Sequence, residues 1–243
     1  MVKIQRFGFS TLGMALTEGW QLARQTRFVS SLYALLFALC GAIILGLLLA
    51  RGLTPFIIMA AGAFMLVAPI ILAGFFGIAH AHESGAKVHL TDALRGFVMA
   101  SPALWVVALV CALLFMIFIT DAAILYSYMV GGVPVWSHEL LPTTADVQRF
   151  LLWGSVSGVF MAFLIYCVAA FSVPLLYERR TNLVTAVATS VHIVFANFIP
   201  ALVWAIMLSS LIMGSILLLP LLLITLPWLA FASRSLYRHT LPE

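Results

Sequence analysis

Residues 174–204 read PLLYERRTNLVTAVATSVHIVFANFIPALVW. The stretch holds the end of one apolar run, a charged segment, a segment with helical periodicity and the start of the next apolar run. This order is typical of a membrane span, its charged exit, an amphipathic helix on the membrane surface and a second span. Two weaker copies occur around residues 11–35 and 90–105. We therefore predict three repeats, each a surface helix followed by a transmembrane hairpin.

Composition identifies lipid as the main solvent of this chain. Of 243 residues, 64% are hydrophobic and 8% are charged, and the mean hydropathy is +1.17. Soluble domains carry about 25% charged residues, so a water-soluble class is excluded. No polar linker or low-complexity tract divides the sequence. We predict a single transmembrane domain that covers residues 1–243.

The predicted fold is an all-α polytopic membrane protein with six transmembrane helices. A span needs about 20 apolar residues to cross roughly 30 Å of hydrocarbon. By that measure the helices form three hairpins, each preceded by a cytoplasmic-face amphipathic helix. The second span of each hairpin contains a proline: Pro69, Pro174 or Pro227. The predicted spans cover residues 28–50, 56–79, 103–126, 146–177, 198–214 and 218–236.

The distribution of Lys and Arg predicts the orientation. With six spans, both termini and the second and fourth loops share one side, and the opposite side carries only Arg51 and Arg149. Because basic residues favour the cytoplasmic side, both termini are predicted to be cytoplasmic. The same bias explains the net charge of +4 without a nucleic-acid partner. The basic residues on the predicted cytoplasmic side are Lys3, Arg6, Arg24, Arg27, Lys87, Arg95, Arg179, Arg180, Arg234 and Arg238.

Several residues are candidates for contact with lipid headgroups. Trp20 lies on the apolar side of the first predicted surface helix, at the depth that interfacial tryptophans occupy. Basic residues that follow the spans attract anionic lipid by about 1 kcal/mol each. At the exit of the fourth span they could instead cap the end of the helix. The predicted interfacial set is Trp20, Arg24, Arg27, Arg179, Arg180, Arg234 and Arg238.

Histidines and one carboxylate form a candidate metal site. His80, His82, Glu83 and His89 lie within ten residues, and His192 would come near them if the repeats pack around a common axis. Imidazoles with a carboxylate suit Zn, Cu or Ni. The competing interpretation is a solvated polar loop, with His192 hydrogen-bonded on a surface helix. The sequence alone leaves both open and requires no cofactor.

Asp121 is the only acidic residue in the interior of a predicted span, since Asp146 stands at the first position of span four. Ionisable residues within spans are costly and are often functional, although water or nearby tyrosines could reach this position at the outer end of its span. Catalytic patterns are absent from the sequence, which holds no Ser/His/Asp order, HExxH, GxGxxG or P-loop. We therefore predict a protein that is not an enzyme.

Short motifs resemble a known family. The sequence PLLYER is followed by an amphipathic segment, and the resemblance covers most of the chain. It is similar to the bacterial integral membrane proteins grouped as domain of unknown function 2189, which implies a six-span inner-membrane protein without an established activity. Relatives leave span two through a Tyr/Glu and paired-Arg segment, whereas residues 77–83 here read GIAHAHE. The other residues that carry the resemblance are Gly19, Trp20, Ala68, Pro69, Ser190, Asn197, Trp204, Tyr237 and Arg238.

Three functions of different classes fit these observations. The first is an accessory or assembly subunit of a larger membrane complex, for example a respiratory one, with lipid and other membrane subunits as partners. Sparse interior charge and small-residue stripes such as Ala38, Ala42 and Gly46 support it. The second is a small-solute or ion transporter or channel built on the threefold repeat. The third is a metal or haem binder on the cytoplasmic face.

Overall fold

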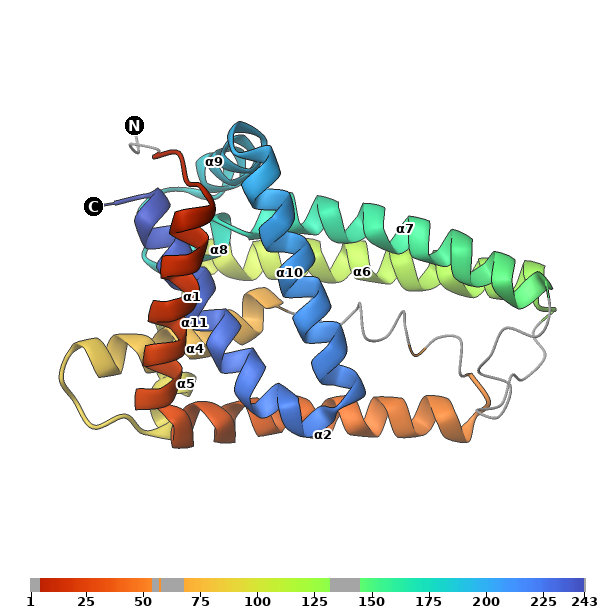
Figure 1. Ribbon diagram of the computed structural model, residues 1–243, viewed down its shortest axis with the longest axis horizontal. Helices are drawn as coiled ribbons and strands as arrows, with labels where there is room; N and C mark the ends of the chain where they lie inside the picture. The colour runs from red at the N-terminus through yellow and green to blue at the C-terminus, as the bar shows by residue number, and fades with distance from the viewer. Residues whose placement is uncertain (1–4, 54–56, 58–67, 132–144, 243) are drawn as a thin grey trace.

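The computed structural model describes residues 5–53, 57, 68–131 and 145–242, which are largely helical and include no β-strand. Figure 1 shows long helices along the main axis of the molecule and a packed end that holds both termini. The elements are α1 (Phe9–Gln25), α2 (Arg27–Ala50), α4 (Ala68–Glu83), α5 (Leu90–Met99), α6 (Pro102–Met129), α7 (Ala145–Ala169), α8 (Ser172–Tyr177), α9 (Leu183–Ala196), α10 (Phe198–Leu217), the 3₁₀ helix η3 (Leu219–Leu221) and α11 (Leu222–Thr240).

Five helical segments of the described chain are long and apolar enough to cross a membrane. They correspond to predicted spans one, three, four, five and six, with their ends shifted by a few residues. Of predicted span two, residues 56 and 58–67 lie outside the described residues. The sixth span and the three-hairpin arrangement therefore stay predictions. The five segments are residues 27–50, 102–129, 145–177, 198–216 and 219–240.

Predicted span four contains a break that the sequence did not indicate. α7 ends at Ala169 and α8 begins at Ser172. The buried hydroxyl of Ser190, in α9, accepts a hydrogen bond from the Phe171 N–H (3.1 Å) and donates one to the Cys167 carbonyl (2.8 Å). Backbone groups inside hydrocarbon must find partners within the protein. Ser190 supplies them here, so the segment changes course without exposing its backbone.

α4 continues beyond the predicted end of span two at Ala79. It ends at Glu83, so His80, His82 and Glu83 lie in the last helical turn and not on the irregular loop that the polar sequence suggested. Gly85, at φ 73°, donates its N–H to the His82 carbonyl (3.0 Å) and closes the helix. The left-handed conformation of a glycine is a common helix terminus. The end of α4 is therefore set by the helix-breaking Gly85 and not by the first polar residue, His80.

α1 packs along α11 in a close antiparallel crossing (Figure 1). A Cβ at Gly19 would come within 2.5 Å of the backbone nitrogen of Ala232, so only glycine allows this approach. Trp20 packs edge-on against Trp228 with ring centroids 5.5 Å apart, and the Trp228 indole N–H donates to the Leu16 carbonyl (2.9 Å). The buried face of α1 consists of Leu12, Ala15, Gly19 and Ala23.

The segment that precedes α1 is held by hydrogen bonds to the end of α11 and to the junction of α9 and α10. The Gln5 N–H donates to the Thr240 carbonyl (2.9 Å), and the Phe7 N–H donates to Oδ1 of Asn197 (3.2 Å). The sequence assigned the apolar side of α1 to the membrane interface. In the structure most of that side packs against α11. Trp20 still exposes 39% of its surface. Its contact with lipid headgroups stays a prediction.

α10 and α11 diverge from η3 as a V (Figure 1), close to the predicted turn at residues 214–219. Pro227 lies inside α11 and has no N–H, so the carbonyl of Leu223 lacks its helical partner. The hydroxyl of Ser31, in α2, donates to that carbonyl at 3.0 Å. The neighbouring helix therefore satisfies the backbone group that the proline frees.

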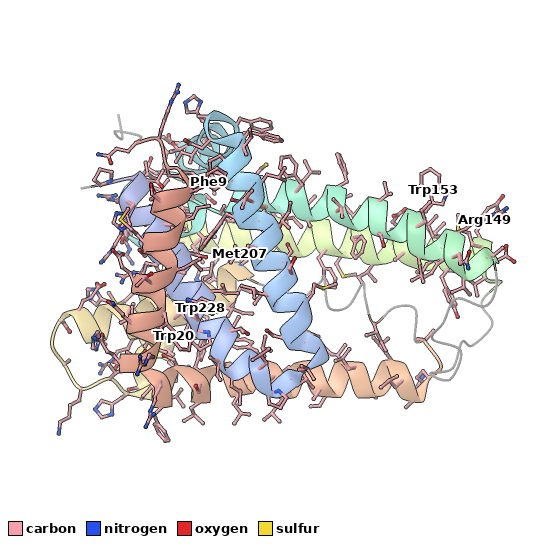
Figure 2. All side chains as sticks on the ribbon, in the orientation of Figure 1. Phe9, Trp20, Arg149, Trp153, Met207 and Trp228 are labelled. Atoms are coloured by element: carbon pink, nitrogen blue, oxygen red, sulfur yellow. The ribbon has the colours of Figure 1, made fainter. Side chains whose placement is uncertain are left out.

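The antiparallel pair α6–α7 extends away from the packed end, and α2 runs in a similar direction (Figure 1). Arg149 and Trp153 lie near the far end of this pair (Figure 2). Its outer part has a small core of its own: Phe118, Ala122, Tyr126 and Phe150. Most of the surface of the pair is apolar and exposed.

Helices occupy the three positions predicted for surface helices, namely α1, α5 and α9. α5 packs on α4, and α9 packs on α7 and α8. The structure contains no membrane. The location of these helices on a cytoplasmic membrane surface therefore stays a prediction.

Candidate functional site

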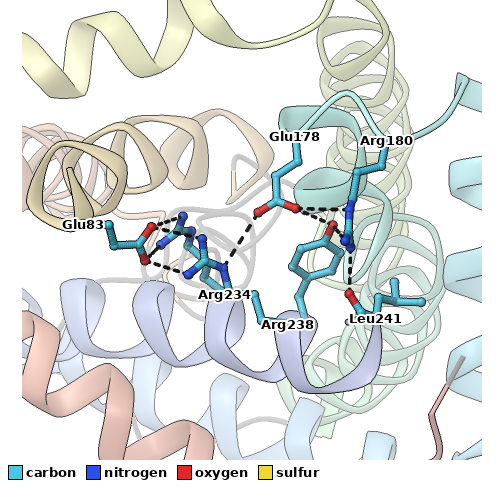
Figure 3. A network of polar contacts seen from close by, with 7 residues as sticks. Glu83, Glu178, Arg180, Arg234, Arg238 and Leu241 are labelled. Carbon is cyan, nitrogen blue, oxygen red and sulfur yellow. Dashed lines mark hydrogen bonds and ion pairs between the residues drawn. The ribbon is translucent and has the colours of Figure 1, made fainter. Parts of the chain in front are cut away.

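Charged residues from the ends of three helices lie together although they are distant in sequence. Glu83 ends α4, Glu178 and Arg180 directly follow α8, and Arg234 and Arg238 lie in the last turns of α11 (Figure 3). Each helix carries one of the recurring prolines noted in the sequence: Pro69, Pro174 and Pro227. The ends of the proline-bearing helices of all three predicted units therefore converge at one place.

Glu83 binds two arginines of α11. Its carboxylate accepts from Nη1 and Nη2 of Arg234 (2.5 and 2.9 Å) and from Nη1 and Nη2 of Arg238 (2.8 and 3.0 Å). Arg234 is 5% exposed, so its charge depends on this partner. Burial alone would raise the pKa of Glu83. The hydrogen bonds and charges of Arg234 and Arg238 outweigh burial and hold that pKa below its usual value.

Glu178 organises the second half of the cluster. It accepts a hydrogen bond from the Tyr237 hydroxyl (2.8 Å) and lies 3.7 Å from Nε of Arg180 and 3.9 Å from Nε of Arg238. Arg180 also donates Nη1–H to the Tyr237 hydroxyl (3.2 Å) and to the Leu241 carbonyl (2.7 Å). Arg238 contacts both carboxylates and so joins the two halves (Figure 3).

A cavity of about 730 Å³ lies against this cluster. Its volume falls within the range of about 300–1,000 Å³ that is usual for small-molecule sites. Helix ends from all three predicted units contribute to its wall, together with the end of α5. The lining residues are His80, Glu83, Ser84, Met99, Tyr177, Glu178, Arg179, Arg180, Arg234 and Arg238.

Comparison with protein families assigns the chain. Residues 56–178, half of the sequence, match the family described as predicted integral membrane protein, domain of unknown function 2189 (DUF2189). The chain belongs to the DUF2189 family. It is an integral membrane protein by this membership and by its five candidate spans. No curated protein and no solved structure matches it.

The motif residues of this DUF2189 protein lie at joints of the fold. PLLYER forms α8 and its charged exit, and Ser190 bridges the break before it. Gly19 allows the α1–α11 crossing, and Trp204 is 3% exposed. The exit of span two departs from the family pattern, yet a contact exists there, because Glu83 binds arginines from α11.

The predicted lipid-contacting residues fall into two groups in this family member. Trp20, Arg24 and Arg27 line a separate groove of about 640 Å³ between α1, α2 and α11. The other residues line the charged cavity. There Arg234 is buried and bound to Glu83, and the contact of this group with lipid headgroups stays a prediction. The second group comprises Arg179, Arg180, Arg234 and Arg238.

The predicted metal ligands are not brought together. Within the described residues, no group of three or more His, Cys, Asp or Glu side chains is placed to hold a metal ion. His82 contacts Gln25 (3.0 Å), and the carboxylate of Glu83 is taken by arginines. His89 precedes α5 as its N-cap, and His192 is exposed on α9. His80 alone of the predicted histidines lines the charged cavity.

Asp121 has a local partner inside the α6–α7 pair. The hydroxyl of Ser157, in α7, donates to its Oδ2 at 2.5 Å. Interhelical hydrogen bonds of this kind hold membrane helices together. The acid within the span therefore has a polar partner inside the pair, and a functional role for Asp121 stays a prediction.

Sequence reasoning missed the pairing of Glu83 with α11, the hydrogen bonds of Tyr237 to Glu178 and Arg180, and the place of Tyr177 in the cavity wall. The available signal was the recurrence of charged residues after each proline-bearing span. It indicated that the three exits are equivalent, but not that they touch. The pairing depends on how α4, α8 and α11 are placed in space, which periodicity does not contain.

Proposed function

We propose that this protein is a non-catalytic inner-membrane protein that serves as an accessory or assembly subunit of a larger membrane complex, such as a respiratory one. The observation that carries the proposal is the uneven packing of its helices. In their most apolar stretches, α2 buries 17% of its residues and α6 buries 28%, against 56% for the last span. Long apolar helices with so few contacts inside the chain offer surface to lipid and to other membrane proteins.

The exposed side of α2 adds support. Of the small residues Ala38, Ala42 and Gly46, Ala38 is buried within the chain, whereas Gly46 is exposed, and among the described residues a Cβ at Gly46 would meet nothing within 4 Å. Small residues in membrane helices permit close approach of another helix. A partner helix from another subunit would find this approach open.

Charge placement supports a cytoplasmic location for both termini. The termini lie together at the packed end, whereas Arg149 lies at the far end of α7 (Figures 1 and 2). Arg51 directly follows α2, at the end of that helix away from the termini. The described basic residues thus separate along the molecule in the manner that the positive-inside rule requires.

Purification from the native membrane tests the proposal. The full-length protein, expressed at its natural level, is solubilised in mild detergent, captured and examined by mass spectrometry. We expect a membrane protein to co-purify in fixed stoichiometry. The absence of any such protein from repeated native-level purifications would overturn the proposal.

A matched pair of variants locates the interface. Gly46→Ile adds bulk to the exposed face of α2, and Gly214→Ile adds the same bulk at another open position. Both variants should retain the wild-type melting temperature, since nothing described lies within 4 Å of the added Cβ. We expect only Gly46→Ile to lose the partner. Retention by both variants would place the interface elsewhere on the protein.

A further inference from the structure

The cavity at the three helix ends carries more positive than negative charge. Four arginines and two glutamates line it, which leaves an excess of two positive charges. Glu83 is fully engaged by Arg234 and Arg238, and Glu178 is engaged by Tyr237 and flanked by arginines. The carboxylates are therefore neutralised within the cluster. The remaining guanidinium charge favours an anion.

Tyr177 provides an independent observation at the same place. It lines the cavity and is 8% exposed, and its hydroxyl oxygen is buried without a hydrogen-bond partner among the described residues. A buried polar group without a partner costs about 1–3 kcal/mol. Such groups are few in native structures and call for an explanation. A ligand oxygen in the cavity would accept the hydrogen bond that this hydroxyl offers.

The backbone conformation of Arg179 is a further observation at this cavity. It follows α8 with φ 56°, in the left-handed region, and its Nη2 donates to the Met99 carbonyl at 3.1 Å across the cavity wall. The corresponding residue after α4 is Gly85, at φ 73°. Glycine is the residue that this position prefers, and other residues adopt the conformation at a cost. Here an arginine occupies the position despite that cost, and its side chain lies at the rim of the charged cavity.

We propose that this cavity is a binding site for a phosphate-bearing anion, either the headgroup of an anionic phospholipid or a free phosphate compound. Arg179 and Arg180 supply charge, and the Tyr177 hydroxyl donates a hydrogen bond to a phosphate oxygen. Arginine is well suited to phosphate because its planar donors match the oxygens. This site is independent of the partner surface on α2, so it goes beyond the proposed subunit role.

Thermal unfolding of the full-length protein in neutral detergent tests the site. Sodium phosphate is titrated against sodium chloride at equal ionic strength. We expect a saturable rise in melting temperature with phosphate alone, because binding to the native state stabilises it. In nanodiscs of phosphatidylcholine, we expect the same rise on addition of phosphatidic acid.

Two variants make the test specific. Tyr177→Phe removes only the unpartnered hydroxyl and should raise the melting temperature without ligand, because that buried group has no hydrogen-bond partner in the described residues. Arg179→Gly relieves the left-handed arginine and should raise the melting temperature without ligand. Both should weaken the apparent affinity for phosphate by about tenfold or more, as expected for loss of a hydrogen bond to a charged group. Tyr128→Phe and Arg149→Gln, which lie away from the cavity, serve as controls and should bind like the wild type.

The outcomes separate the two sources of phosphate. A rise with phosphatidic acid but not with inorganic phosphate assigns the site to lipid, and a rise with both assigns it to phosphate in general. A rise with inorganic phosphate alone assigns it to a soluble compound. If neither ligand raises the melting temperature, or if Tyr177→Phe and Arg179→Gly respond like the controls, the proposal is overturned.

Discussion

α11 and α2 are both long enough to cross a membrane, yet they are built for different surroundings. α11 contacts α1, α2, α4 and α10, and it carries the buried Arg234 and the tight crossing at Ala232. α2 exposes a row of large apolar side chains along most of its length. The packed end is therefore held by specific close contacts and ion pairs. The positions of α2, α6 and α7 in a membrane depend mainly on the apolar character of their side chains, and many different sequences have that character.

The difference predicts where substitutions will matter. A protein interior is closely packed, so added or lost atoms are felt at once. An apolar surface in lipid tolerates exchange of one apolar residue for another. Changes near α11 should therefore disturb the whole fold, whereas comparable changes in the α6–α7 pair should have small effects.

The largest effect is expected at the α1–α11 crossing. Gly19→Ala places a Cβ within 2.5–2.7 Å of Ala232, so the two backbones must separate. Overpacking of this kind costs about 1–3 kcal/mol. Gly13→Ala, in the same helix with nothing within 4 Å, should instead stabilise by about 0.5–1 kcal/mol. Unfolding in detergent, followed by circular dichroism, measures both. Equal stability of the two variants would show that α1 does not pack on α11 in this way.

An intermediate effect is expected from acidification. The pKa of Glu83 is lower in the folded protein than its ordinary value of 4.5. Its contribution to stability is therefore complete above pH 4.5 and is lost as the pH falls through the folded value, which lies lower. Melting temperatures measured from pH 7 down to pH 3 should reveal the loss.

Glu83→Gln sharpens this measurement. At neutral pH it should cost about 1 kcal/mol, a modest figure because 36% of the Glu83 side chain is exposed. The gap between wild type and variant should narrow as the pH falls below 4.5, because the unfolded chain binds a proton at Glu83 there before the folded protein does. A gap that stays constant with pH would show that the charge of Glu83 does not stabilise the cluster.

The smallest effect is expected in the α6–α7 pair. Ser157→Ala removes the hydrogen bond to Asp121. Interhelical hydrogen bonds in a membrane contribute about 0.6 kcal/mol on average, so the melting temperature should fall only slightly. A loss larger than that of Gly19→Ala would reverse the comparison and make the α6–α7 pair the better packed region.

Much of the helical architecture could be predicted because it is local. Apolar runs placed five spans within a few residues of the observed helices. Boundaries failed where a tertiary partner decides them. The break before Ser172 depends on Ser190, which lies 19 residues from Phe171. α4 reaches Glu83 because polar residues in a helix-compatible stretch do not end a helix and Gly85 does.

The candidate site was less predictable. The sequence identified Arg179, Arg180, Arg234 and Arg238 as candidates for the membrane interface, but it did not indicate that they line one cavity. It grouped Glu83 with histidines because they are neighbours in sequence, whereas the structure pairs it with arginines about 150 residues away. Charge type and position can be read from the sequence. The partner of each charge requires the packing of α4, α8 and α11.

The contact between α1 and α11 also sets an order of events during synthesis. About 210 residues separate Gly19 from Ala232, so at about 5–20 residues per second the ribosome needs roughly 10–40 s to make the second helix after the first. Throughout that interval the side of α1 that packs on α11 lacks its main partner within the chain. A nascent chain that stops before Ala232 therefore cannot form the close crossing at Gly19, and the packed end is completed only when the last helix has been made.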